Sequence, residues 1–242
     1  MVNTLRDIFK SKLSRIYIII ELVLLLALVS LQIVLMAQGR YLQEKTNDLW
    51  VYTGILKITL TSISLIIVII TFIANYKKEI STLDLLIMYF VLIVVADVFF
   101  SLTSNTLVPH ICFLLAYLVF IFIRKGKWFE PFIPIGIGVL IFIFLWLVIK
   151  MNPLMAIIDS ILGSILLFNG IRCWYMYKKT KDRFYLLFAL ATTFIMVSDL
   201  LIALGTFIKN PMELNNAIFL LNWPFYVSGN ILFVSNYMLY KK

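Results

Sequence analysis

The chain has 242 residues, of which 63% are hydrophobic and only 14% are charged, and its mean hydropathy is +1.03. This composition excludes an ordinary soluble enzyme, because a soluble domain cannot hide so much apolar surface. A transmembrane helix needs about 20 apolar residues. Such windows recur along the whole chain, at 16–36, 51–75, 80–102, 107–123, 131–149, 154–176, 184–208 and 217–239. We therefore predict an all-α, polytopic membrane protein whose single domain (1–242) is a bundle of eight transmembrane helices.

The net charge is +9, and its distribution indicates membrane topology rather than binding to nucleic acid. Fifteen Lys and Arg residues lie in the N-terminal segment, the C-terminal tail and alternate connections between spans, whereas only four lie in the other connections. Because Lys and Arg are enriched in cytoplasmic loops, both termini are predicted to be cytoplasmic. We expect an integral, multi-pass protein of a bacterial inner membrane, with membrane lipids and not nucleic acid as its surroundings.

Ionisable side chains inside the predicted spans are the first candidates for function. In chain order they are Lys57, Asp97, His110, Asp159 and Asp199. Counted along their helices, all five fall in the extracytoplasmic half of the membrane, and Asp199 is the deepest. Because intramembrane acids are rare and costly, we predict that these residues form one polar pocket open to that side.

Helical spacing places further polar residues on the same helix faces. Lys57 and Thr61 share a face of the second span, and Tyr226 lies between Asn222 and Asn230 on a face of the eighth. Two interpretations of these stripes stay open at this point. They are either hydrogen-bonding residues that hold helices together, or the lining of a functional site.

Other polar positions have simpler interpretations. Asp84 is predicted to favour the N-terminus of the third span, where a carboxylate interacts well with the helix dipole. Gly163 lies between Ser160 and Ser164, and these small residues predict close helix packing. Glu21 is an isolated acid in the first span, and the sequence offers no partner for it.

Motifs of soluble enzymes do not occur, including those for dinucleotides, nucleotide phosphates, zinc proteases and serine hydrolases. The chain has one histidine and two cysteines, Cys112 and Cys173, which are predicted near opposite ends of their spans. We therefore expect neither a metal site nor a disulfide. Haem would need more histidine, and retinal would need a lysine in a late span, so no cofactor is expected.

Three spans contain motifs that occur together in one known family. They are LIMYFVLIVVADVFFSL in the third span, CFLLAYLVFIF in the fourth and FALATTFIMVSDLLIAL in the seventh. In this order and spacing they resemble the lysoplasmalogenase (YhhN-like) family of integral membrane proteins, whose members have eight spans. The most specific part of the match is the pair Ser198–Asp199 followed by Ala203.

Four positions depart from the family pattern, while both aspartates remain. Ala96 replaces the glycine before the acid of the third span, and Ile58 replaces the proline after the lysine of the second. Tyr117 stands where the family has a histidine, and Gly229 stands where it has a glutamine after the aromatic pair of the eighth span.

The resemblance implies hydrolysis of the vinyl ether bond of a lysoplasmalogen, a lysophospholipid. The products are a fatty aldehyde and glycerophosphoethanolamine or glycerophosphocholine. Two neighbouring acids suit this chemistry independently, because one carboxyl must protonate the vinyl carbon while an ionised one stabilises the cation and deprotonates water. We expect Asp199, the deeper residue, to be the acid and Asp97, nearer to water, to be the ionised partner.

Five further residues are predicted to bind the substrate: Lys57, His110, Tyr117, Asp159 and Tyr226. Lys57 either holds the substrate phosphate or serves as counter-ion to an aspartate. His110 lies seven residues before Tyr117 on the same helix face. It either replaces the family histidine by hydrogen-bonding Asp97 or a water molecule beside it, or is an interfacial histidine at a helix start.

A different class of protein stays open for the whole chain. As the alternative to the hydrolase, the same ionisable residues are compatible with a non-catalytic lipid-binding or small-molecule-binding membrane protein, or with a proton-coupled transporter. The sequence does not indicate the oligomeric state.

Overall fold

The computed structural model describes residues 12–38, 48–75, 83–103, 106–124, 127–149, 153–207 and 212–239. Within these ranges the regular structure consists of eight α-helices, without strands. The helices are α2 (Lys12–Ala37), α3 (Asp48–Asn75), α4 (Leu83–Leu102), α5 (Leu107–Ile123), α6 (Phe132–Ile149), α7 (Pro153–Thr180), α8 (Arg183–Phe207) and α9 (Met212–Leu239). Each predicted span coincides with one helix, so the predicted all-α class is confirmed.

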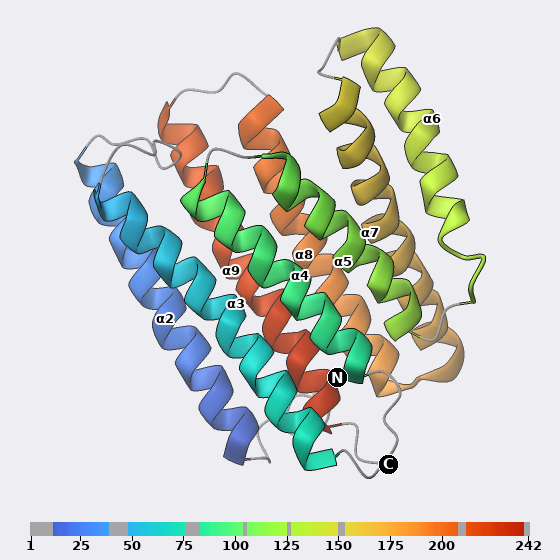
Figure 1. Ribbon diagram of the computed structural model, residues 1–242, viewed down its shortest axis with the longest axis horizontal. Coiled ribbons are helices and arrows are strands. Elements are labelled where there is room, and N and C mark those ends of the chain that lie inside the picture. Colours follow the sequence, from blue (N-terminus) through green and yellow to red (C-terminus); the bar gives the residue numbers. More distant parts are fainter. Residues whose placement is uncertain are drawn as a thin grey trace.

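Neighbouring helices in the chain run antiparallel, so α2 begins and α9 ends at the same end of the bundle (Figure 1). The packed pairs connect seven helices into a closed ring in the order α2, α3, α4, α5, α7, α8 and α9, with α9 returning to α2. Helix α6 lies outside this ring and packs against α7 (Figure 1). Helix α3 also contacts α9, so the two halves of the ring meet at this point.

Six of these helices are long and apolar enough to cross a membrane, namely α2, α3, α4, α7, α8 and α9. The apolar parts of α5 and α6, Leu107–Ile123 and Phe132–Phe144, are shorter. A chain with six such helices is a multi-pass α-helical membrane protein.

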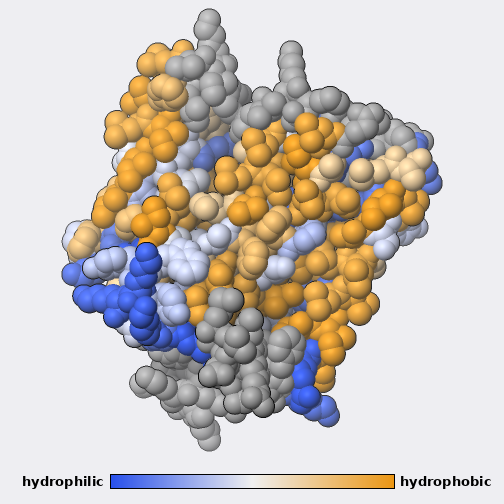
Figure 2. All heavy atoms as spheres, turned by 180° about the vertical axis from the view of Figure 1, so that it is seen from behind, coloured by the Kyte–Doolittle hydropathy of each residue, from blue (hydrophilic) through white to orange (hydrophobic). Residues whose placement is uncertain are grey.

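The surface of the bundle is apolar, and polar side chains lie inside it. Leu26 of α2 and Leu140 of α6 are more than half exposed, at 66% and 69%. Figure 2 shows apolar residues over much of the rear face, with hydrophilic residues gathered towards its edges. Asn169, Thr192 and Ser198, in contrast, are completely buried. This arrangement fits a protein surrounded by lipid, where polar groups must find partners inside the bundle.

Four aromatic rings from four helices fill one level of the ring. Phe120 of α5 stacks between Tyr89 of α4 and Phe233 of α9, and both pairs of ring centroids are 4.4 Å apart. Phe188 of α8 packs edge-on against Phe233 at 4.6 Å. All four side chains are 99–100% buried, so they hold the helices around the site at fixed separations.

Helices α6 and α7 pack closely at a glycine, but not at the glycine that the sequence indicated. A Cβ atom on Gly138 of α6 would lie 2.5 Å from the Cα of Ile161 of α7, so these helices touch through Gly138. Gly163, the predicted packing residue, is exposed, and a Cβ atom there would meet nothing within 4 Å. The three small residues of α7 therefore differ: Ser160 and Ser164 are buried, as the predicted close packing requires, whereas the prediction fails at Gly163, which has no close neighbours.

Candidate functional site

Asp97 is the buried acid of α4, and its side chain points into the ring. The residue is 4% exposed. Its carboxylate accepts a hydrogen bond of 3.3 Å from the hydroxyl of Tyr226 on α9. The Thr61 hydroxyl and the Lys57 ammonium group, both on α3, also lie close to this carboxylate. Asp97 thus joins three helices and has a cation within electrostatic range.

Asp199 is the acid of α8, and its surroundings are different. Its carboxylate accepts a hydrogen bond of 3.0 Å from the hydroxyl of Tyr117 on α5. The charged neighbour within electrostatic range is a second acid, Asp159 of α7. Asp199 is half-buried. One aspartate therefore has a lysine nearby, whereas the other has a second acid nearby.

Three tyrosines bring the two aspartates into one site. Tyr89 and Tyr226 each lie within electrostatic range of both carboxylates. Tyr117 lies within the same range of Asp199 and of the other two tyrosines. The structure therefore brings together Asp97, Asp199, Tyr117 and Tyr226 from four different helices.

Tyr89 is the member of this group that the sequence analysis missed. It is completely buried, and in the described part of the chain its hydroxyl has no hydrogen-bond partner. A signal was available, because Tyr89 precedes Asp97 by eight residues and these positions share a helix face. A buried hydroxyl between two carboxylates is a group that can hold a water molecule or a polar part of a ligand.

His110 pairs with a different acid from the one predicted. Its Nε2 atom lies 3.4 Å from Oδ1 of Asp159, and its Nδ1 atom lies 2.5 Å from the Thr106 carbonyl oxygen, one turn earlier in the chain. The physical reason is the order of the ring, since α5 packs against α7 as well as α4. The first alternative for His110, a contact with Asp97, is therefore not found, whereas its place in the first turn of α5 agrees with the second alternative. Asp159 lies beside His110 and within electrostatic range of Asp199.

The predicted order of burial is also reversed. The depth of Asp199 along its helix predicted the more enclosed carboxyl, yet Asp97 is the buried one and Asp199 is half-buried. Depth along one helix does not report which neighbours cover a side chain.

Lys57 lies with its Nζ atom 4.6 Å from the centre of the Trp223 ring, so this cation is held against α9 beside Asp97.

The polar stripe on α9 makes contacts both with the candidate site and with the neighbouring helix. Tyr226 contacts Asp97 within the site. Asn222, one turn earlier, accepts a hydrogen bond from the Ser198 hydroxyl of α8. Gly229 allows this close approach of α8 and α9, because a Cβ atom there would lie 2.7 Å from Cγ1 of Ile195. The serine before Asp199 thus holds the helix that carries the acid.

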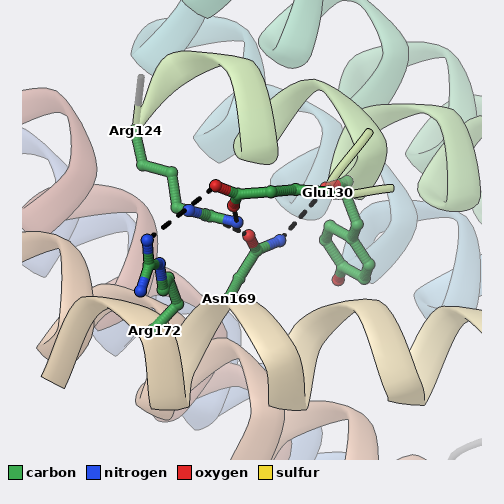
Figure 3. Close-up of polar contacts among 5 residues, drawn as sticks. Arg124, Glu130, Asn169 and Arg172 are labelled. Atoms are coloured by element: carbon green, nitrogen blue, oxygen red, sulfur yellow. Dashed lines mark hydrogen bonds and ion pairs between the residues drawn. The ribbon is translucent and has the colours of Figure 1, made fainter. Parts of the chain in front are cut away.

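A second polar cluster lies beside the site, where α5 ends (Figure 3). The Arg124 guanidinium donates to the Glu130 carboxylate and, through Nε, to Oδ1 of Asn169 at 2.8 Å. Arg172 of α7 lies 4.0 Å from the other oxygen of Glu130. Arg124 is one of the fifteen basic residues of the predicted topology, and none of the three residues Arg124, Glu130 and Asn169 was predicted to belong to a cluster.

Glu130 lies in the connection between α5 and α6, outside the apolar segments. Burial raises its pKa, but the hydrogen bond from Arg124 and the charges of Arg124 and Arg172 outweigh burial. The pKa of Glu130 is therefore lowered from its ordinary value of 4.5. Glu130 is ionised at neutral pH, and this buried ion pair persists.

Glu21 has partners that the sequence did not reveal. Ser64 of α3 donates a hydrogen bond of 3.1 Å to its carboxyl, and the Tyr17 hydroxyl lies 2.8 Å from the Ser64 oxygen. All three residues are 99–100% buried at the contact between α2 and α3. This group stabilises a helix pair away from the two aspartates.

Within the described ranges, no three His, Cys, Asp or Glu side chains converge as a metal site requires, and Cys112 and Cys173 are free thiols. No model of a known protein family matches the chain, and neither does any curated protein or solved structure. The chemical groups of the site are two carboxylates in different electrostatic surroundings, three phenols and one ammonium group. Such a set can donate a proton at one point and accept one at another.

Proposed function

We propose that this chain is a membrane-embedded hydrolase that cleaves the vinyl ether bond of lysoplasmalogens. The observation that supports the proposal best is the pair of carboxylates, Asp97 and Asp199, which border the same buried tyrosines. The resemblance of the spans carrying these aspartates to the lysoplasmalogenase (YhhN-like) family supports the same reaction. The lipid-facing helices surround the site with apolar surface, which suits a substrate that carries a long alkenyl chain.

In the proposed reaction a carboxylic acid donates its proton to the vinyl carbon farther from the ether oxygen. The carbon next to the oxygen becomes an oxocarbenium centre. Water attacks this centre and loses a proton to the second carboxylate, which gives a hemiacetal. The bond between this carbon and the glycerol oxygen then breaks, and the glycerol oxygen takes up the proton from the second carboxyl group. The hemiacetal hydroxyl loses its proton to the first carboxylate, which restores the carboxylic acid. The net reaction consumes one water molecule and yields a fatty aldehyde and glycerophosphoethanolamine or glycerophosphocholine.

Neighbouring charges assign the two roles. The Lys57 ammonium group faces Asp97, and a cation stabilises a carboxylate. Asp159 faces Asp199, and a second negative charge there is unfavourable. Asp199 is thus the proton donor and Asp97 the base. Tyr89 is placed to hold the attacking water molecule, because its hydroxyl lies near both carboxylates.

We further propose that all eight helices span the membrane and that both termini are cytoplasmic, in a bacterial inner membrane. Eight of the fifteen basic residues behind this topology lie in the described ranges, and all of them lie at the end of the bundle where α2 begins. They are Lys12, Arg15, Arg124, Lys127, Lys178, Lys179, Lys181 and Arg183. In a variant without native cysteines, an impermeant maleimide should label Thr106→Cys in whole cells and leave Thr180→Cys unlabelled. If the cysteine at position 180 alone were labelled, both termini would instead be extracytoplasmic.

The decisive experiment for the function is aldehyde release by the purified protein in lipid nanodiscs. A lysoplasmalogen is compared with the ester lysophospholipid of the same chain length and head group. The proposal predicts turnover of the vinyl ether alone. In deuterium oxide, one deuterium should appear on the carbon next to the aldehyde, and water labelled with oxygen-18 should label the aldehyde oxygen, because proton and oxygen both come from water.

Variants of the two aspartates test their roles. Asp97→Asn and Asp199→Asn should each lower turnover by at least about 100-fold, the usual scale for loss of an acid or base. Asp84→Asn is the matched control, because Asp84 is an exposed acid in the first turn of α4. Wild-type turnover in both site variants would disprove the two-carboxylate mechanism. Tight lipid binding without aldehyde release from any vinyl ether would instead identify a non-catalytic lipid-binding protein.

A further inference from the structure

Asn169 of α7 connects the cluster of Arg124 and Glu130 to the candidate site. Asn169 is completely buried. Its Oδ1 atom accepts the 2.8 Å hydrogen bond from Arg124 Nε, and its Nδ2 atom donates a 3.3 Å hydrogen bond to the backbone carbonyl of Tyr117 (Figure 3). A guanidinium group only donates hydrogen bonds, so it must face the amide oxygen. The amide nitrogen is thereby turned towards Tyr117.

Arg124 is itself held in one position. Its backbone N–H closes the end of α5 with a 3.1 Å hydrogen bond to the Phe120 carbonyl, and its guanidinium lies 5.3 Å from the centre of the Phe168 ring. The Glu130 carboxylate takes a second guanidinium N–H. Arg124 is only 4% exposed, so few alternative positions are open to it.

Tyr117 carries this connection to the site. The residue is completely buried, with its ring centroid 5.7 Å from that of Phe120 and 6.2 Å from that of Phe113. Its hydroxyl donates the 3.0 Å hydrogen bond to Asp199. A continuous chain of contacts therefore runs from the α5–α6 connection, through Asn169 and Tyr117, to the carboxyl of α8.

We propose that Asn169, oriented by Arg124, is a positioning residue that holds the Tyr117 hydroxyl against Asp199. The inference rests on the proposed function for its effect on turnover, but not for its effect on the hydrogen bond itself. The bond to the Tyr117 carbonyl fixes the rotation and height of α5 against α7. Because a misplacement of about 1 Å in a reacting group can lower a rate about 100-fold, this restraint matters for chemistry.

The direct test observes the Tyr117 hydroxyl without any substrate. Position 117 is labelled with 3-fluorotyrosine, and its fluorine NMR signal is measured in nanodiscs. Asp199→Asn removes the carboxylate acceptor and calibrates the shift. Asn169→Leu should move the signal in the same direction, and Arg124→Lys should move it part of the way. Asn236→Leu is the matched control, because Asn236 is a buried asparagine that donates a 3.1 Å hydrogen bond to the Phe184 carbonyl elsewhere in the bundle.

The kinetic test separates positioning from general stability. Asn169→Leu should lower kcat at least about tenfold with little change in KM, since the lost restraint acts on the reacting groups. The double variant with Tyr117→Phe should be no slower than the slower single variant, because both changes remove the same contact.

The outcomes of the two tests are distinguishable. The positioning role is overturned if Asp199→Asn shifts the fluorine signal but Asn169→Leu and Arg124→Lys both leave it at the wild-type position. The use of two variants keeps this conclusion available if one of them does not fold. If the wild-type protein releases no aldehyde, the proposed function fails, yet the fluorine measurement still decides whether Asn169 controls the contact between Tyr117 and Asp199.

Discussion

Replacement of Glu130 by glutamine tests the buried ion pair at the end of α5. The side chains of Arg124 and Glu130 are 3% and 8% exposed, so solvent screens their interaction little. The change leaves the Arg124 guanidinium buried without its carboxylate. Removal of one partner from a buried pair costs about 3–5 kcal/mol. At about 2–4 °C per kcal/mol for chains near this size, Glu130→Gln should lower the unfolding temperature by about 6–20 °C.

The pH dependence of this loss follows from the lowered pKa of Glu130. A carboxyl with a lower pKa in the folded state than in the unfolded state stabilises the fold above its unfolded pKa. This stabilisation is lost as the pH falls through the folded value. The unfolding temperature of the wild type should therefore fall more steeply than that of Glu130→Gln below about pH 4.5, and the two should approach each other in acid.

Thermal unfolding of the purified protein in nanodiscs, followed by circular dichroism between pH 7 and pH 3, measures both effects. Asp84→Asn again serves as control, since an exposed acid should change the unfolding temperature little. Equal unfolding temperatures for wild type and Glu130→Gln at pH 7 would refute the energetic importance of the pair. A difference that stays constant down to pH 3 would refute its dependence on the Glu130 charge.

Three further changes address the helices around the two aspartates. Gly229→Ala should destabilise the protein by about 1–3 kcal/mol, because the new methyl group would lie 2.7 Å from Cγ1 of Ile195. In a thermal unfolding assay, the additional change Ile195→Ala should recover part of this loss. Lys57→Met should destabilise the protein. If Lys57 and Asp97 are counter-ions, the double variant with Asp97→Asn should recover part of the lost stability, whereas strictly additive effects of the two changes on stability would argue against the pair. Tyr226→Phe should lower kcat by removing the hydrogen bond to Asp97, and an unchanged kcat would exclude that bond from the reaction.

The sequence predicted the helices well because lipid imposes a simple rule on them. The predicted span 107–123 has the same bounds as α5, and the other spans overlap one helix each. An apolar run of this kind forms a helix irrespective of distant residues, since its backbone hydrogen bonds are local. Asp97 and Asp199 were predictable for the related reason that ionisable residues within such runs point inwards.

The partners of charged residues were less predictable, because they depend on the order of the helices in the ring. His110 contacts Asp159 because α5 packs against α7, a relation that no local pattern reveals. Arg124 follows the last residue of an apolar run, where a basic residue ordinarily marks the cytoplasmic side. Its buried position depends on Glu130 and Asn169, and the latter lies 45 residues farther along the chain.

The closed ring also constrains how the protein is made. Helix α9 packs against α2, α3 and α8, so it connects the two ends of the series of described helices. Until α9 is present, Asp97 lacks Tyr226 and Ser198 lacks Asn222, and these polar groups border an open side of the bundle. In lipid such groups are costly without partners, so a chain released before α9 is a natural target for membrane proteases. The ring therefore closes only after α9 has been made and has packed against α2.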